Sequence, residues 1–134
     1  MKVIVFDQWD KLVSLIRGMA AGAATAKTQY KIARTVPKDG RVQLVDRAAN
    51  NLAVDGGTTT VLMPDMVPGK ARDFMLRVAA TGENEIAFAG AEAFEGDDGA
   101  LAPPADGETV VYFFTETAAD VMLVARRVAA RIGT

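Results

Sequence analysis

The fold class of this chain is decided by the stretch Ala71–Thr81, which reads ARDFMLRVAAT. Its larger apolar side chains recur at period two and share one face: Phe74, Leu76, Val78 and Ala80. Asp73 and Arg77 fall on the other face. Successive side chains of a β-strand point to opposite sides of a sheet, whereas a helix would scatter these apolar residues around its axis. The stretch therefore predicts a half-buried strand.

Two later runs, Thr109–Thr117 and Asp120–Val128, have the same β-prone character. The first carries large apolar residues at nearly every position, which favours burial on both faces. Residues 118–120 turn the chain between the two runs and predict a hairpin. With Ala71–Thr81, these runs indicate a mainly β protein whose residues 47–134 form an antiparallel β-sandwich.

Turn-forming residues separate the expected strands. Pro37–Gly40 suits a type I turn, and Asp55–Gly57 has the chemistry of a hairpin turn. A further turn is expected at Gly82–Asn84. Residues 95–107, which include Pro103 and Pro104, predict a long surface loop.

The segment 1–46 is expected to attach or assemble the β-domain. Lys2–Phe6 predicts a short strand, and Asp7 is placed to cap an amphipathic helix over Gln8–Met19. The apolar stripe of that helix follows the i, i+3, i+4, i+7 spacing: Trp9, Leu12, Val13, Ile16, Met19 and Ala20. A helix this short needs a docking surface, which is either the chain's own core or a partner subunit.

Composition excludes several classes of function. The chain has 134 residues, a net charge of −2, and neither histidine nor cysteine. Histidine is the commonest general base and both residues are common metal ligands, so we expect no enzyme activity, catalytic residue, cofactor or metal. The acidic balance gives no reason to expect nucleic-acid binding, and no apolar run reaches the ~20 residues of a membrane span.

Acidic and basic side chains gather at three places, each with a simple explanation. Glu92, Glu95, Asp97 and Asp98 supply oxygen ligands for calcium, but their spacing does not match an EF-hand, and a solvated loop is favoured. The carboxylates at positions 83, 85, 116 and 120 are set aside as a glycosidase pair, since no tryptophan platform accompanies them. The arginines at 126, 127 and 131 are best explained as solubilising charge.

Four segments follow one another in a recognisable order: the strand Ala71–Val78, the short strand Ile86–Phe88, the turn Phe94–Asp97 and the run Tyr112–Glu116 before the last strand. In this order the chain resembles small bacteriophage virion proteins of the head-fibre or tail-fibre kind. The resemblance implies a β-sandwich module, often trimeric, that is anchored to a virion by its N-terminal segment.

We therefore expect a virion structural protein, namely a short fibre, spike or decoration protein assembled in the bacterial host cytoplasm. It is expected to form a homo-oligomer, with a trimer favoured, and to contact capsid or tail proteins; a host surface glycan is a further candidate partner. The expected assembly interface consists of Trp9, Leu12, Val13, Ile16, Tyr112 and Phe114, and the outward loop carries Glu95, Asp97 and Asp98. A stand-alone carbohydrate- or ligand-binding β-module is the alternative, and a small enzyme that uses carboxylates alone is the third and least favoured hypothesis.

Overall fold

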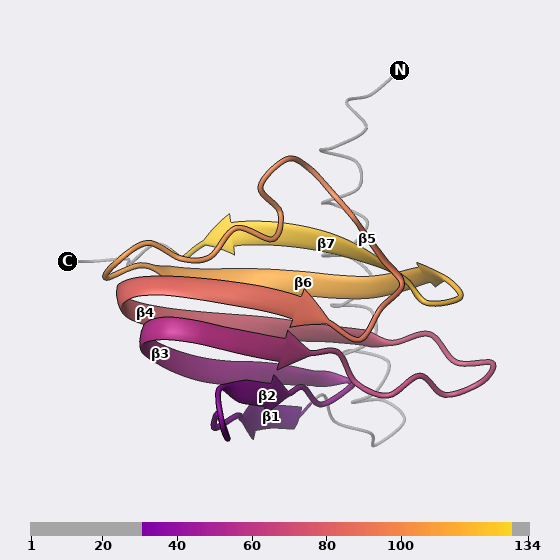
Figure 1. Cartoon of the computed structure of the whole chain (residues 1–134). Coiled ribbons are helices and arrows are strands. Elements are labelled where there is room, and N and C mark those ends of the chain that lie inside the picture. The colour runs from indigo at the N-terminus through magenta and orange to yellow at the C-terminus, as the bar shows by residue number, and fades with distance from the viewer. Residues whose placement is uncertain (1–30, 130–134) are drawn as a thin grey trace.

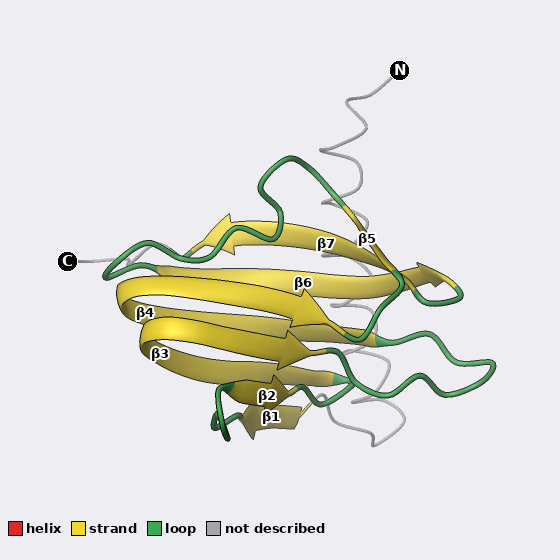
Figure 2. Cartoon of the chain, viewed as in Figure 1, coloured by secondary structure: helices red, strands yellow, loops and turns green. Residues whose placement is uncertain are grey.

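A computed structural model describes residues 31–129, which form seven β-strands (Figures 1 and 2). The strands are β1 (Lys31–Arg34), β2 (Arg41–Gln43), β3 (Ala48–Leu62), β4 (Asp73–Ala89), β5 (Ala93–Glu95), β6 (Thr109–Ala118) and β7 (Val121–Val128). Within this range the protein is mainly β and contains no helix, so no described helix could cross a membrane. The strand expected at Lys2–Phe6 and the helix expected at Gln8–Met19 lie outside the described residues.

All seven strands belong to one mixed sheet, with the order β1-β3-β4-β6-β7-β5 and with β2 also paired to β3. The pairs β4–β6 and β6–β7 are antiparallel, whereas β1, β2 and β4 each run parallel to β3, and β5 runs parallel to β7. The prediction of two wholly antiparallel sheets is therefore wrong. β1 and β2, on the N-terminal side of the boundary expected at residue 46, are hydrogen-bonded to β3 on its other side.

The mixed topology arises because β3 and β4 each bend back on themselves (Figure 1). β3 bends at Gly56 and Gly57, with φ of 79° and 83°, and β4 bends at Gly82, with φ of 77°. Glycine adopts such left-handed angles without the steric cost of a Cβ atom. The two bends are stacked, since a Cβ on Gly82 would lie 3.5 Å from the Gly56 nitrogen. The expected hairpin turn at Asp55–Gly57 is thus a corner within one strand, and Gly82–Asn84 is its neighbour.

Bending also explains how parallel neighbours are joined by a short link. Parallel strands normally need a crossover of a dozen or more residues. Here the second half of β3 has already returned to the end of the sheet where β4 begins, so residues 63–72 suffice. In register, Ala49 pairs with Met75 at one end, and Leu62 pairs with Ala89 at the other.

The hydrophobic core lies between the two halves of the folded sheet. The prediction for Ala71–Thr81 is confirmed, because four alternate residues of β4 are buried: Phe74, Leu76, Val78 and Ala80. From β6, Phe114 stacks on Phe74 with ring centroids 5.0 Å apart. Phe88, from the second half of β4, crosses to Tyr112 and Phe114 at centroid distances of 5.2 and 5.9 Å. These contacts hold the front and back halves of the sheet together.

Two predicted turns are found at or next to their expected positions. β6 and β7 form the expected antiparallel hairpin, and Asp120 adopts a φ of 59° at its turn. At the earlier turn, Lys38 and Arg41 exchange both backbone hydrogen bonds. The two central residues, Asp39 and Gly40, have positive φ, which a type I′ turn requires and a type I turn does not allow. The turn therefore lies one residue further along the chain than the predicted Pro37–Gly40, and the predicted type is wrong.

Candidate functional site

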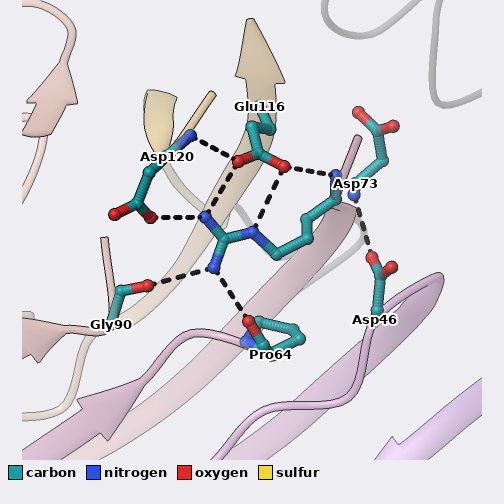
Figure 3. Close-up of polar contacts among 7 residues, drawn as sticks. Asp46, Pro64, Asp73, Gly90, Glu116 and Asp120 are labelled. Carbon is teal, nitrogen blue, oxygen red and sulfur yellow. Dashed lines mark hydrogen bonds and ion pairs between the residues drawn. The ribbon is translucent and has the colours of Figure 1, made fainter. Parts of the chain in front are cut away.

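The most concentrated polar site in the described residues is built around Arg72, which directly precedes β4 and is 2% exposed (Figure 3). Its guanidinium group has five N–H donors, and each has an acceptor. Nε donates to Glu116 Oε1 at 3.3 Å, and Nη2 donates to Glu116 Oε2 at 3.0 Å and to Asp120 Oδ1 at 2.9 Å. Nη1 donates to the carbonyl oxygens of Pro64 at 2.8 Å and Gly90 at 3.0 Å.

Glu116, near the end of β6, has hydrogen-bond donors in the same site for both of its carboxylate oxygens. Besides the paired contact with the guanidinium, its carboxylate accepts from the backbone N–H of Arg72 at 3.1 Å and of Asp120 at 2.8 Å. Its own backbone N–H donates to the Arg72 carbonyl at 2.8 Å. The site therefore joins the start of β4, the end of β6, the β6–β7 turn and the segments around Pro64 and Gly90 (Figure 3).

The pKa values of the pair are moved apart by these contacts. Burial alone would raise the pKa of Glu116, but the hydrogen bonds from Arg72 and from the backbone of Asp120 and Arg72 lower it below its usual value. Burial alone would lower the pKa of Arg72, but the hydrogen bonds to Glu116 and Asp120 hold it above its usual value. Both groups are thus fixed in their charged forms, which suits a structural ion pair and disfavours proton transfer.

A second buried carboxylate lies next to this site, at Asp73 (Figure 3). Burial raises the pKa of Asp73, and this effect outweighs the opposite influence of Thr115 and Arg47. Its backbone N–H donates to the Asp46 carboxylate at 2.9 Å. Close by, the fully buried Asn50 donates to the carbonyl oxygens of Val45 at 3.0 Å and Met75 at 2.9 Å. These contacts fix the chain that enters β3 against the start of β4.

A shallow pocket of about 460 Å³ lies beside Arg72, between the segment Met63–Met66 and the segment Gly90–Glu92. An arginine facing a pocket could bind an anion if its donors were available. In this protein all five donors are already engaged by protein oxygens, so the guanidinium offers no spare N–H to a ligand. The arrangement supports fixation of the fold, and it does not resemble an acid–base or nucleophilic centre.

The long loop, residues 96–108, is fastened to β6 and β7. The Tyr112 hydroxyl donates to the Ala102 carbonyl oxygen. Arg126 donates to the same oxygen at 2.9 Å and to the Pro103 carbonyl at 3.0 Å, and it lies 3.5 Å from Glu108. Arg126 is therefore a positioning residue for the loop, in contrast to the solubilising role expected from the sequence.

The three residues expected at the outward loop, Glu95, Asp97 and Asp98, are exposed. Glu95 ends β5, and Asp97 and Asp98 are exposed at the loop tip. Within residues 31–129, no group of three or more acidic side chains is arranged to hold a metal ion. The tip is shaped by the Ala100 N–H, which donates to the Asp97 carbonyl oxygen at 2.9 Å.

The structure divides the expected assembly interface. Tyr112 and Phe114 are both 0% exposed and fill this chain's own core, so their rings leave no surface for a partner. This is a correction: Phe88, from the second half of β4 in the same chain, packs against both rings. Trp9, Leu12, Val13 and Ile16 lie outside the described residues.

Sequence reasoning missed Arg72 and grouped its partners differently. The sequence indicates Glu116 and Asp120 only as two of four nearby carboxylates, and the structure brings these two together around a cation. Glu83 and Glu85 are not part of this group. The available signal was an arginine immediately before a buried strand, although a cation at a strand start is common enough that this signal is weak.

Comparisons with protein-family models, curated proteins and solved structures found no match to this chain.

Proposed function

We propose that this chain is a non-enzymatic structural protein of a bacteriophage virion: a short fibre, spike or decoration protein. In this proposal it forms a homo-oligomer, with a trimer favoured, is attached through its N-terminal segment and presents loop 96–108 outward. We propose further that the two halves of the sheet act as the two layers of a β-sandwich, and that an amphipathic helix at Gln8–Met19 precedes this sandwich in the sequence.

The observation that carries the proposal is the fastening of loop 96–108 to the β6–β7 hairpin. Two side chains from the rigid sheet, Tyr112 and Arg126, converge on one carbonyl oxygen of the loop, at Ala102. The acidic tip at Asp97 and Asp98 remains exposed. Loops held by a rigid scaffold are the usual carriers of recognition, and this arrangement presents one without providing a catalytic centre.

The proposed oligomer has apolar surface available in the described part of the chain. Val36, just after the edge strand β1, is 72% exposed, and Met66 and Val67, in the loop before β4, are 52% and 49% exposed. By contrast, the large exposed apolar residues among 31–129 include no aromatic side chain that would serve as a sugar-stacking platform. The carbohydrate-binding alternative therefore has no specific support from these residues.

Labelling of phage particles tests the proposed role. Particles from a culture that carries the gene would be purified, and an antibody raised against loop 96–108 would be located by immunogold electron microscopy. The expected result is regular labelling of the capsid or tail surface. An antibody against the buried strand Asp73–Val78 is the matched control, because native particles should hide that epitope.

The result that would contradict the proposal is an unlabelled particle with the protein recovered entirely in the soluble fraction.

Light scattering of the purified full chain provides a second measurement. The expected mass is a multiple of the 14.2 kDa chain mass, with three chains favoured. A particle of one chain at all concentrations would contradict the oligomer.

A further inference from the structure

The outer face of the sheet carries a continuous apolar row that the core does not use. Strand register aligns five residues across β1, β3, β4, β6 and β7: Ile32, Ala49, Met75, Phe113 and Ala125. They point away from the core, because their neighbours Leu76, Tyr112 and Val124 are the buried residues of the same strands. We call this set the outer row.

The outer row is an unusual surface for a sheet of this kind. A sheet that faces water on one side normally alternates apolar residues inside with polar residues outside. In the outer row all five residues are apolar, Ile32 is 80% exposed and the others are partly exposed. The second halves of β3 and β4, which cover the core, lie on the opposite side of the sheet.

The neighbouring row on the same face is basic. Register aligns Arg34, Asn51, Arg77, Val111 and Arg127 across the same five strands. A complementary occupant would therefore carry an apolar stripe along the outer row and acidic groups toward the arginines. The row spans five strands at ~4.8 Å spacing, which is about 19 Å.

One segment of this chain has the required apolar stripe and carries acidic groups at one end. Residues 8–20 include the predicted stripe of Trp9, Leu12 and Ile16. Asp7 and Asp10 lie at the N-terminal end of that segment, and Lys11 and Arg17 are its basic residues off the stripe. The twelve residues of the helix expected at Gln8–Met19 extend about 18 Å at 1.5 Å each, which is close to the length of the outer row. The ten residues between Ala20 and Lys31 reach up to about 35 Å, which is enough to place the helix anywhere along the row, since β1 itself begins at its edge.

We infer that the outer row is the docking site for the chain's own N-terminal amphipathic helix, with the Trp9 stripe packed across β1, β3, β4, β6 and β7. This inference selects the chain's own sheet over a partner subunit as the surface that the stripe buries. Its consequence for attachment, which rests on the proposed function, is that the strand expected at Lys2–Phe6 then becomes the part of the segment that contacts other virion proteins.

Trp9 is the single tryptophan of the chain, so its fluorescence tests the inference directly in the full-length protein. The expected emission is blue-shifted relative to the urea-unfolded chain and protected from acrylamide. Ala125→Arg, in the outer row, and Ile16→Asp, on the helix stripe, should each shift the emission toward that of the unfolded chain and remove the protection.

Two matched controls should leave the emission unchanged. Ala87→Arg introduces the same charge at an exposed residue in the second half of β4, and Ser14→Asp changes the polar face of the same helix. Because Ile16→Asp leaves the described strands untouched, a folding defect in Ala125→Arg alone would not obscure the result.

The inference is overturned if Trp9 in the native chain emits and is quenched as in the unfolded chain, or if neither Ala125→Arg nor Ile16→Asp exposes it. It is also overturned if the emission shifts on dilution through a monomer–oligomer transition, because the occupant is then a second copy. None of these outcomes depends on labelling of a virion, so failure of the inference is distinguishable from failure of the proposed function.

Discussion

At the scale of single residues, the Arg72–Glu116 pair decides how the end of the sheet is held. Side-chain exposures of 2% and 5% mean that neither charge is stabilised by water if the other is removed. Removal of one partner of such a buried pair costs about 3–5 kcal/mol, because an uncompensated charge is left inside the protein. The pair therefore makes the fold depend on a specific polar contact.

We predict that Glu116→Gln lowers the free energy of unfolding at pH 7 by about 3 kcal/mol or more. Urea unfolding of both proteins measures this difference. The pKa of Glu116 is lowered in the folded state, so its stabilisation is present above the ordinary glutamate pKa of ~4.3 and is lost as the pH falls through the lower folded value. The difference between the two proteins should accordingly shrink in acid.

Glu108→Gln is the matched control for that experiment. It removes a carboxylate that lies 3.5 Å from Arg126 but is 31% exposed. An ion pair of this kind contributes less than about 1 kcal/mol, because water and salt screen it. Equal losses for the two variants, or a difference that grows in acid, would contradict the role assigned to the buried pair.

At the scale of elements, the end of β4 is constrained by close approach to the residues after β3. Gly90 has a φ of 95°, and a Cβ there would lie 2.9 Å from the Met63 nitrogen, closer than real Cβ atoms come. Gly99, in the long loop, also has a positive φ, of 78°, but a Cβ there would meet nothing within 4 Å. An alanine at either position would have a strained backbone, but only an alanine at Gly90 would also be crowded by neighbouring atoms.

We predict that Gly90→Ala destabilises the protein more than Gly99→Ala does. The left-handed backbone costs each variant about 1–2 kcal/mol, and Gly90→Ala adds displacement of the Met63 backbone. Because the Gly90 carbonyl also accepts from Arg72, that displacement loosens the buried site. Thermal and urea unfolding measure both variants, and equal losses would show that crowding at Gly90 is relieved easily.

The loop 96–108 provides the second prediction at this scale. Arg126→Ala removes two hydrogen bonds to the loop backbone, at Ala102 and Pro103. We expect amides of the loop to exchange faster with deuterium, while those of Asp73–Val78 keep their protection. Arg77→Ala, an exposed arginine on the outer face of β4, is the control and should leave the loop unchanged. Unaltered loop exchange in Arg126→Ala would contradict the fastening.

At the scale of the whole molecule, the sequence predicted the strands better than their arrangement. The alternation of apolar and polar residues correctly predicted the buried face of β4, and the turn residues between the last two strands correctly predicted the β6–β7 hairpin. The glycine pair Gly56–Gly57 indicates a change of direction, but a glycine corner within a strand and a hairpin turn have the same local composition. Which of the two forms depends on pairing between residues about 26 positions apart, such as Ala49 with Met75, and local patterns do not encode that pairing.

The candidate site was less predictable for the same reason. Arg72, Glu116 and Asp120 are distant in sequence and meet because the sheet folds over. Nor could alternation show that Tyr112 and Phe114 would be covered by Phe88 of the same chain, since an apolar run looks alike whether its cover is internal or a partner.

The stacked corners of β3 and β4 have a consequence for the lengths that this chain can tolerate. Asp55 pairs with Thr81 before the corner, and Gly57 pairs with Asn84 after it. Between these pairs β3 has one residue, Gly56, whereas β4 has two, Gly82 and Glu83, so β4 follows the longer path around the bend. An inserted or deleted residue at either corner would reverse the facing of everything beyond it, turning Val61 or Phe88 outward. Relatives of this protein should therefore vary in length within loop 96–108 and keep the residue count of both corners, even where the side chains there change.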